Sequence, residues 1–341
     1  MRAITALLLA DDRPGHYHLS DGIVEAARRL RPVEIVRMRV KRRWSGRILA
    51  PLCNVGISPR WLLRIGYGID ASTLPKADII VSAGAEMLAA NIAASRLLGV
   101  PNVHYGSLRQ FRPGDFALVL TSYAEHAQGP GQAMVLKPSA LKLPSGAGSA
   151  GKIAGGTPPR EAALLIGGDS GECRFTDQEW RALLAFVDAT HNAFGTRWRI
   201  SNSRRTAASA SDLIAERVTS GSPAIAAFVD VRTAGPGTLG AVLDGADVVI
   251  CTDDSSSMIS ECVAAQLPVI GVRPQHQALS AEEQGYRDFM TGNGWYRSVA
   301  IVELSPDLLL SELSAITPMT EDPLDRLAAI LRERLPDVFA D

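Results

Sequence analysis

The chain has 341 residues, which is more than one average domain and suits two domains that each bury a core. Apolar residues make up 46% of it and charged residues 21%, ordinary values for a globular protein that argue against a disordered or coiled-coil chain. No segment approaches the roughly 18 consecutive apolar residues of a membrane span, and the opening apolar run lacks the features of a cleavable signal. We therefore expect a cytoplasmic protein.

The net charge of −1 hides a strong asymmetry between the two halves. Residues 1–150 contain 19 Lys and Arg against 10 Asp and Glu, whereas residues 151–341 contain 16 against 26. Much of the positive excess lies in a basic segment, Arg37–Arg64, which also contains Trp44. This segment is suited to an anionic membrane surface or a phosphorylated acceptor, and a solvated basic face is the alternative interpretation. Nucleic acid is not expected as a partner, because no recognised binding motif accompanies the charge.

The four cysteines are Cys53, Cys173, Cys251 and Cys262. They form neither a C-x-x-C pair nor a Cys/His cluster with the spacing of metal ligands. We expect buried, reduced thiols, no bound metal and no cofactor.

Short apolar runs alternate with longer amphipathic ones along residues 1–143, a pattern typical of strands and helices that build a largely parallel sheet. The predicted helices include Ser20–Leu30 and Met87–Leu98. The predicted strands are Ile4–Ala10, Val33–Met38, Ile79–Ser82, Asn102–His104 and Ala117–Thr121. This stretch is interpreted as an N-terminal Rossmann-like domain.

The composition changes over residues 144–160, which are rich in Gly, Ser and Pro and indicate a linker or loop. A G-x-G-x-x-G sequence falls at Gly146–Gly151. It lacks the strand before it and the helix after it that a dinucleotide-binding fingerprint requires, so we interpret it as part of the linker.

Alternation resumes over residues 161–318, interpreted as a C-terminal domain. Thr176 and Glu179 form a capping box that predicts a helix over Trp180–Phe194. Residues 319–341 are predicted to end the chain in an amphipathic helix. The predicted strands of this half are Ala162–Ile166, Trp198–Ser201, Ala226–Val229, Val248–Cys251 and Val269–Val272.

Three polar loops follow predicted strands of the second half, and the carboxyl ends of parallel strands meet at one edge of a sheet. Glycines in the first loop let the backbone approach a ligand, and the second supplies hydroxyls and two guanidinium groups that suit phosphate. We predict that these loops bind the donor of a transfer reaction. The predicted donor-binding residues are Gly167, Gly168, Asp169, Ser170, Ser201, Ser203, Arg204, Arg205, Thr252, Asp253, Asp254, Ser255, Ser257, Met258 and Glu261.

The third of these loops leads into a helix predicted from about Met258 to Ala265. A helix N-terminus with adjacent hydroxyl groups is suited to phosphate. Asp254, Ser257 and Glu261 share one side at positions i, i+3 and i+7, where the Glu261 carboxylate can accept both ribose hydroxyls. Simple helix capping is the alternative role of the Ser and Asp side chains.

In the first half, the opening strand runs into a loop that ends with His16. Ligands of open α/β sheets bind at this end of a strand, and a His with an ordinary pKa near ~6.5 is suited to act as a general base. Asp11 and Asp12 are the competing candidates, and Arg13 and Gly15 are predicted on the acceptor side. A structural role for the His is the alternative.

Together these motifs resemble the bacterial and plant mitochondrial fission ELM family, whose members are described as glycosyltransferases. The resemblance covers nearly the whole chain and rests on Asp12–His16, Ile166–Ser170, Ser203–Arg205 and Thr252–Glu261. The last of these also looks like the donor-site segment of GT-B enzymes such as the lipid-linked peptidoglycan N-acetylglucosaminyl transferase, in which an acidic residue of this helix holds the donor ribose.

The resemblance implies an α/β, GT-B-like fold of two Rossmann-like domains whose largely parallel sheets face a central cleft. It implies the acceptor in the first domain, a nucleoside-diphosphate sugar in the second, no required metal, and a C-terminal helix that packs back toward the first domain. His16 takes the place of the base of several inverting members. Asp11, Asp12 and Arg13 stand where those members have a Gly-rich loop.

We therefore predict transfer of a sugar from a nucleoside-diphosphate sugar to an acceptor hydroxyl, on a glycan or lipid at the inner face of a membrane. Two alternatives stay open. A nucleotide-sugar epimerase of the same fold would bind the same donor and add acid/base residues around the sugar, and a non-catalytic scaffold would keep the fold for interaction alone.

Overall fold

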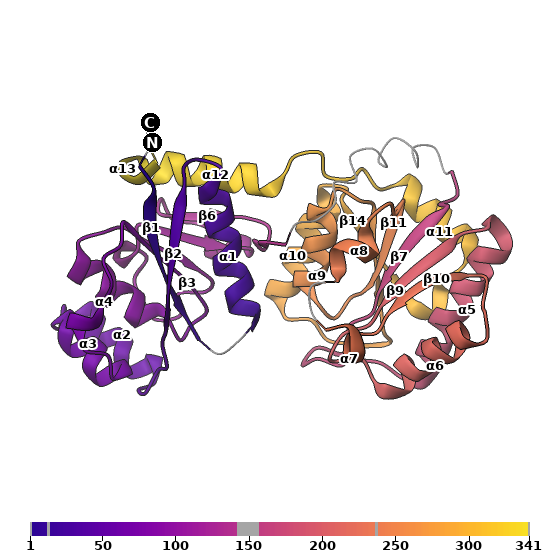
Figure 1. Ribbon diagram of the computed structural model, residues 1–341, viewed down its shortest axis with the longest axis horizontal. Coiled ribbons are helices and arrows are strands. Elements are labelled where there is room, and N and C mark those ends of the chain that lie inside the picture. Colours follow the sequence, from indigo (N-terminus) through magenta and orange to yellow (C-terminus); the bar gives the residue numbers. More distant parts are fainter. Residues whose placement is uncertain (1, 12–13, 142–156, 236–237, 340–341) are drawn as a thin grey trace. The chain divides into compact units, whose positions relative to one another are not determined.

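The computed structural model describes residues 2–11, 14–141, 157–235 and 238–339, with the side chains of residues 14–16 excepted (Figure 1). It divides into two compact units. Unit 1 comprises Met1–Leu141 and Pro323–Asp341, and unit 2 comprises Lys142–Asp322. The predicted linker, residues 144–160, lies outside the described residues as far as residue 156.

Unit 1 is built on a six-stranded sheet in which all paired strands run parallel. The order is β2-β1-β3-β4-β5-β6, with bounds Val33–Arg39, Ile4–Ala10, Ile79–Ala83, Asn102–Tyr105, Leu118–Thr121 and Gln132–Met134. Every residue of β3, β4 and β5 is buried, because parallel strands are covered by helices on both faces.

Helices cover both faces of this sheet. One face packs against α1 (Pro14–Arg28), α12 (Pro323–Arg334) and α13 (Pro336–Phe339). The other packs against α2 (Gly46–Asn54), α3 (Pro59–Tyr67) and α4 (Leu88–Leu98). Arg29, directly after α1, donates a hydrogen bond to Asp325 of α12 at 2.5 Å. Side chains of α12 and α13 share one core with those of the N-terminal strands.

Unit 2 repeats this plan with its own parallel sheet. The order is β10-β9-β7-β11-β12-β14, with bounds Ile225–Val229, Arg197–Ser201, Glu161–Leu165, Val248–Thr252, Val269–Arg273 and Tyr296–Ala300. A small antiparallel pair, β8 (Cys173–Arg174) with β13 (His276–Gln277), lies in the loops. Because β9, β7 and β11 are adjacent and parallel, the loops that follow them leave from the same edge of the sheet.

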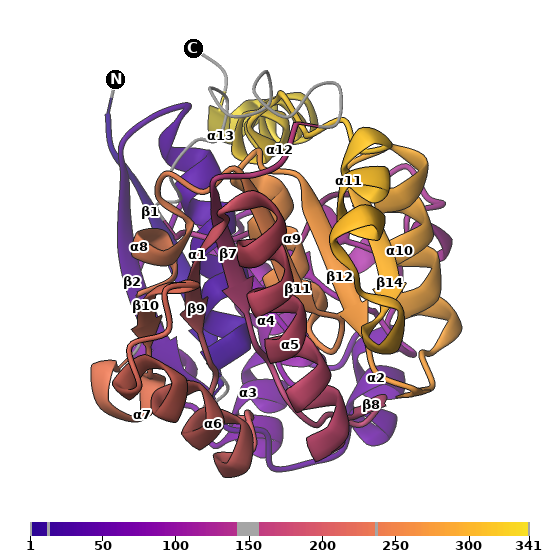
Figure 2. The same cartoon turned by 90° about the vertical axis from the view of Figure 1, so that its right-hand side faces the viewer.

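The main core of unit 2 lies between its sheet and α5 (Asp177–Phe194), α6 (Ala208–Thr219) and α11 (Pro306–Ser314), the face turned toward the viewer in Figure 2. Trp198 fills its centre and is fully buried. Four further helices belong to this unit: α7 (Val231–Ala234), α8 (Leu239–Leu243), α9 (Ser256–Ala264) and α10 (Ala281–Gly292).

The predicted α/β fold class is confirmed, and the predicted strands agree with the observed ones to within two residues at either end. The capping box at Thr176 is present, with both of its reciprocal hydrogen bonds. The pattern did not predict β6 or β14. Both are edge strands, which carry polar side chains and therefore lack the continuous apolar run of a central strand.

The first helix also differs from its prediction. It begins at Pro14 and not at Ser20, so residues 14–16 lie in its first turn. Proline is favoured there because its fixed φ suits a helix and its missing N–H costs no intrahelical hydrogen bond. Among the described residues, no helix is long and apolar enough to cross a membrane.

Candidate functional site

The loops after β7 and β11 are joined by a short chain of hydrogen bonds. The Gly167 N–H donates to the Thr252 hydroxyl at 2.7 Å, and the Gly168 N–H donates to the Asp254 carboxylate at 3.2 Å. The Thr252 hydroxyl in turn donates to Asp254 at 2.6 Å. The two predicted loops therefore form one continuous structure, as their place at one sheet edge led us to expect.

The loop after β9 closes against the same glycines. The Ser203 hydroxyl donates to the Gly167 carbonyl at 3.0 Å. A Cβ atom at position 167 would lie 2.2 Å from the Asp254 carboxylate, and one at position 168 would lie 2.0 Å from the Arg205 carbonyl oxygen. Glycine is therefore required at both positions by the close approach of the three loops.

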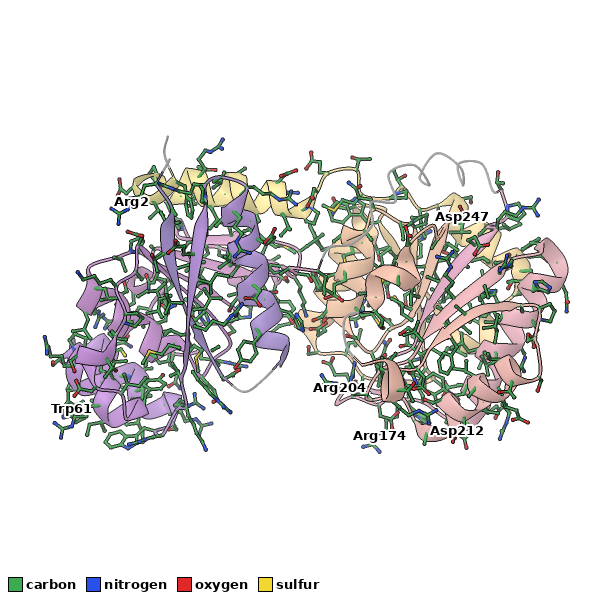
Figure 3. The ribbon with its side chains drawn as sticks, viewed as in Figure 1. Arg2, Trp61, Arg174, Arg204, Asp212 and Asp247 are labelled. Atoms are coloured by element: carbon green, nitrogen blue, oxygen red, sulfur yellow. The ribbon has the colours of Figure 1, made fainter. Side chains whose placement is uncertain are left out.

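Asp254 lies at the junction of the three loops and its side chain is fully inaccessible. Arg205 forms an ion pair with it, with 2.6 Å between Nη2 and Oδ2. Burial raises the pKa of Asp254, while the hydrogen bond from Thr252 and the charge of Arg205 act in the opposite direction. The carboxylate is thus engaged in holding the loops together. Arg204 is exposed and makes no hydrogen bond or ion pair within the described part of the chain, which leaves its guanidinium available to a ligand (Figure 3).

A cavity of about 380 Å³ opens beside this junction. Ser255 is the N-cap of α9, and its hydroxyl accepts from the Met258 N–H at 3.4 Å. The positive end of the helix dipole therefore faces the cavity. The lining residues are Ser170, Gly171, Glu172, Asp254, Ser255, Ser256, Ser257 and Glu283. Hydroxyl groups, a helix N-terminus and the carboxylates of Glu172 and Glu283 make this a strongly polar site.

Asp253 lies in a different environment from its two neighbours. Its carboxylate is 1% exposed and accepts four hydrogen bonds, at 2.7 to 3.1 Å. The donors are Arg287, Tyr296, Gln277 and Ser298. These residues border a second polar cavity, of about 520 Å³, on the β12–β14 side of the unit. Predicted as a donor-binding residue, Asp253 has its carboxylate oxygens already satisfied by the protein, so its role in the fold is to position the end of β11.

The network continues to the first cavity through α10. Arg287 donates to the Glu283 carboxylate at 2.9 Å, and Glu283 accepts from the Ser256 hydroxyl at 3.2 Å. Glu172, Glu283 and Arg287 are not among the residues predicted from the sequence. The signal for Glu283 and Arg287 is a run of charged residues in an amphipathic segment, which a solvated helix face would give equally well. Glu172 is one acidic residue in the loop after β7 and gives no signal of its own.

The remaining predicted donor residues lie around the same loops with different exposures. Asp169 is exposed and its carboxylate accepts from the Phe175 N–H at 3.0 Å. Ser201 is buried and donates to the Asn202 carbonyl, which turns it away from a ligand. Met258 and Glu261 are partly exposed on α9, and Ser257 is exposed.

The catalytic residues of unit 1 are predicted around the carboxyl end of β1. Asp11 is buried there. Asp12 and Arg13 lie outside the described residues, and Gly15 and His16 belong to the first turn of α1, without described side chains. The geometry of this candidate base therefore stays a prediction from the sequence.

Residues 14–335 match the family model described as "Mitochondrial fission ELM1". No curated protein sequence matches the chain.

Several solved structures share its fold over almost their whole length. UDP-GlcNAc 2-epimerase from Methanocaldococcus jannaschii has a TM-score of 0.54 at 12% identity, covering 97% of this chain and 100% of that one. MnaA from S. aureus, in a structure with UDP, has a TM-score of 0.54 at 10% identity, with 99% and 98% covered. MurG from Acinetobacter baumannii has a TM-score of 0.51 at 10% identity, with 97% and 99% covered. At these identities the likeness shows the fold, which is GT-B.

Proposed function

We propose that this chain, which belongs to the mitochondrial fission ELM1 family, binds a nucleoside-diphosphate sugar in unit 2 and transfers the sugar to an acceptor hydroxyl. The observation that carries the proposal is the junction of Gly167, Gly168, Arg205 and Asp254 beside a cavity lined by hydroxyl groups. Two structural neighbours of the fold support it by their names, one as a UDP-GlcNAc 2-epimerase and one by its bound UDP.

In this proposal the diphosphate lies at the N-terminus of α9. The backbone N–H groups of the first turn and the hydroxyls of Ser255 and Ser257 would donate to its oxygens, and Arg204 would balance the charge that develops on the leaving group. Such stabilisation of developing charge needs no bound metal. Glu261, further along α9, would accept hydrogen bonds from the ribose hydroxyls.

The acceptor side is assigned to unit 1. We propose His16 as the general base there, and the basic segment Arg37–Arg64 as the part of the chain that faces an anionic membrane carrying the acceptor. Both assignments come from the sequence pattern.

A nucleotide-sugar epimerase is the second candidate, and a specific observation favours it. Glu172 and Glu283 line the cavity next to Asp254, and acidic groups around the sugar are what proton transfer during epimerisation would use. Glu172 accepts from the Ser280 N–H at 2.9 Å, and Glu283 is paired with Arg287, so both carboxylates are held in fixed positions.

A thermal-shift screen of the full chain with UDP, GDP, TDP and CDP tests the shared part of the two candidates, because a ligand that binds only the folded state raises its stability. Glu261→Ala should weaken binding of the stabilising nucleotide by about 1–3 kcal/mol, the cost of leaving hydrogen-bonding groups unpaired. Glu216→Ala, on the exposed side of α6, is the matched control and should leave binding unchanged. No stabilisation by any nucleotide would refute the proposal.

Nuclear magnetic resonance of the corresponding nucleotide sugar then separates the candidates. Inversion of a sugar carbon without an acceptor indicates the epimerase, and release of the nucleoside diphosphate with an added acceptor indicates the transferase. A sugar nucleotide that binds and stays intact under both conditions indicates the scaffold.

A further inference from the structure

Unit 1 contains a cavity of about 640 Å³ that the proposed function does not use. It lies at the carboxyl edge of the sheet, beside the first turn of α2. Three arginines from separate segments line it: Arg42 before α2, Arg47 within α2, and Arg109 after β4. The other lining residues are Ser45, Gly46, Ala85, Leu88, Gln110 and Phe111. Among the described residues, no carboxylate lines this arginine cavity.

Two of these arginines have no polar partner in the part of the chain that the structure describes. Arg47 and Arg109 are exposed and make no hydrogen bond or ion pair with any described residue. Arg42 is engaged by long contacts: it donates to the Ala85 carbonyl at 3.4 Å and lies 4.0 Å from Glu86, between Nη2 and Oε1. Positive charges that line one cavity repel each other. An anion bound between the arginines would therefore lower the electrostatic energy of the site.

Arg109 carries a second signal. Its φ is 55°, in the left-handed region that non-glycine residues seldom adopt. Such a conformation is strained for a residue with a Cβ atom and persists where the surroundings require it. The next residues bring Gln110 and Phe111 to the cavity wall, so this turn places Arg109 at its rim.

The surface beside the cavity is apolar. Trp44 directly precedes the lining residue Ser45, and its ring packs edge-to-face on Trp61 of α3 with 6.0 Å between centroids. Trp44, Trp61 and Ile48 are 39%, 40% and 50% exposed. Six large hydrophobic side chains of the described residues are exposed, and four of them lie on or beside α2 and α3: Trp44, Ile48, Val55 and Trp61. Figure 3 shows Trp61 at the outer side of its helix.

The chain segment that carries these exposed side chains has charge of one sign. Between Glu34 and Asp70 the chain has no acidic residue, and it has eight basic ones. Exposed Trp and Ile among arginines match the boundary between lipid headgroups and acyl chains, where indole rings are preferred and basic residues meet anionic lipid. A water-soluble phosphate ester would fit the arginines and would leave the two Trp rings unexplained.

We propose that the arginine cavity binds the phosphate of an anionic membrane lipid while Trp44, Trp61 and Ile48 enter the headgroup layer of the same membrane. The proposal rests on the proposed function, because it gives a defined site to the membrane contact that the proposed function assumes. It is tested without nucleotide, so its failure and the failure of the proposed function are separate results.

The experiment is sedimentation of the full chain with phosphatidylcholine vesicles, with and without phosphatidylglycerol, at low and high salt. We expect binding only with phosphatidylglycerol, weakened by salt. Arg109→Ala should reduce the apparent affinity by about tenfold or more, whereas Arg112→Ala, an exposed arginine three residues away that does not line the cavity, should reduce it by less than about threefold. Equal effects of the two variants would overturn the site.

Two further variants test the chemistry. Arg109→Lys keeps the charge but loses the planar guanidinium that binds phosphate through two hydrogen bonds, so it should bind vesicles nearly as poorly as Arg109→Ala. Wild-type binding by Arg109→Lys would mean that general positive charge, and not a defined phosphate site, attracts the membrane. Trp44→Ser with Trp61→Ser should weaken vesicle binding by about tenfold. Val302→Ser, another exposed apolar residue (67%), should not.

Glycerol 3-phosphate separates the two sources of phosphate. If it displaces the protein from vesicles at concentrations comparable to those of the lipid, and the Trp variants bind vesicles normally, then the ligand is a soluble phosphate ester and the lipid assignment is wrong. Without nucleotide, each variant should unfold at the same temperature as the wild type, which confirms that it folds.

Discussion

Arg287 and Asp253 form an ion pair inside unit 2, with 2.7 Å between Nε and Oδ1 and with side chains 5% and 1% exposed. The same guanidinium reaches the Asp253 carbonyl at 2.8 Å and the Glu283 carboxylate at 2.9 Å. One side chain thus joins the end of β11 to α10 and, through Glu283 and Ser256, to the first turn of α9. Arg287 is therefore a positioning residue for the candidate site.

Replacing Arg287 by Ala should lower the free energy of unfolding by about 3–5 kcal/mol, because it leaves the Asp253 charge buried without its partner. The matched control is Arg297→Ala. Arg297 pairs with Glu312 at 3.1 Å, but its side chain is 38% exposed, so the change should cost less than about 1 kcal/mol. Urea denaturation of both variants measures the difference, and similar midpoints would contradict the positioning role.

The glycine junction gives a second prediction. Gly168→Ala would place a Cβ atom 2.0 Å from the Arg205 carbonyl oxygen, so the loop after β9 must move. We expect a loss of about 1–3 kcal/mol in unfolding free energy, as in other overpacked sites, and a loss of nucleotide binding. Gly171→Ala in the same loop meets no atom within 4 Å and should be near neutral. Calorimetric binding to both variants decides, and full nucleotide affinity in Gly168→Ala would remove the junction from the site.

Much of this arrangement follows from the sequence. Continuous apolar runs identify the central strands, and because neighbouring strands run parallel, the polar loops after β7, β9 and β11 share one edge. The separate role of Asp253 was not predicted, although it follows from the geometry of a strand. Successive side chains of a strand point to opposite faces, so Thr252 and Asp254 reach the glycine loop while Asp253 points away toward Arg287.

The contributions of α10 and β14 depend on tertiary packing. Glu283 and Arg287 lie one helical turn apart, a spacing that predicts an exposed i, i+4 ion pair as readily as a buried network. Tyr296 belongs to an edge strand whose pattern is not distinct from a loop. Only the packing of α10 against β14 decides which of their polar groups reach Asp253.

A third prediction concerns how stability depends on pH at Asp230, which follows β10 and accepts a hydrogen bond from Asn202 in the loop after β9. The side-chain hydrogen bond from Arg232 lowers the pKa of Asp230 from its ordinary 3.8 to about 2, and Asn202 at the end of β9 donates to the same carboxylate at 2.9 Å. A depressed carboxyl pKa stabilises the fold above the unfolded value of 3.8, and this contribution is lost as pH falls through about 2. Because Arg232 is 43% exposed, solvent screening limits the effect to about 0.5–1 kcal/mol.

Denaturation of Asp230→Asn and wild type between acidic and neutral pH checks this. The variant should be less stable near neutral pH, and the difference should vanish as the pH approaches 2. Asp212→Asn removes the other carboxylate that pairs with Arg232, but its side chain is 69% exposed and it should show almost no difference at any pH. A pH-independent deficit in Asp230→Asn would mean that its hydrogen bonds, and not its charge, stabilise this loop.

The last prediction concerns His16, which stands in the first turn of α1 after the carboxyl end of β1. If it removes the proton from the acceptor hydroxyl, His16→Ala should lower turnover by roughly 10²–10⁴-fold, while nucleotide affinity, determined in unit 2, stays nearly unchanged. His18→Ala is the matched control, because His18 is exposed on the same helix two residues further on.

Asp11→Asn tests the competing base, since Asp11 is the described carboxyl group that precedes this turn. Transfer rates of the three variants against pH, with the donor and acceptor that the nucleotide screen identifies, decide between them. A histidine base gives a wild-type rate that rises through about pH 6–7 and a His16 variant without that rise. Wild-type turnover in His16→Ala, with a large loss in Asp11→Asn, would transfer the role of base to the carboxylate.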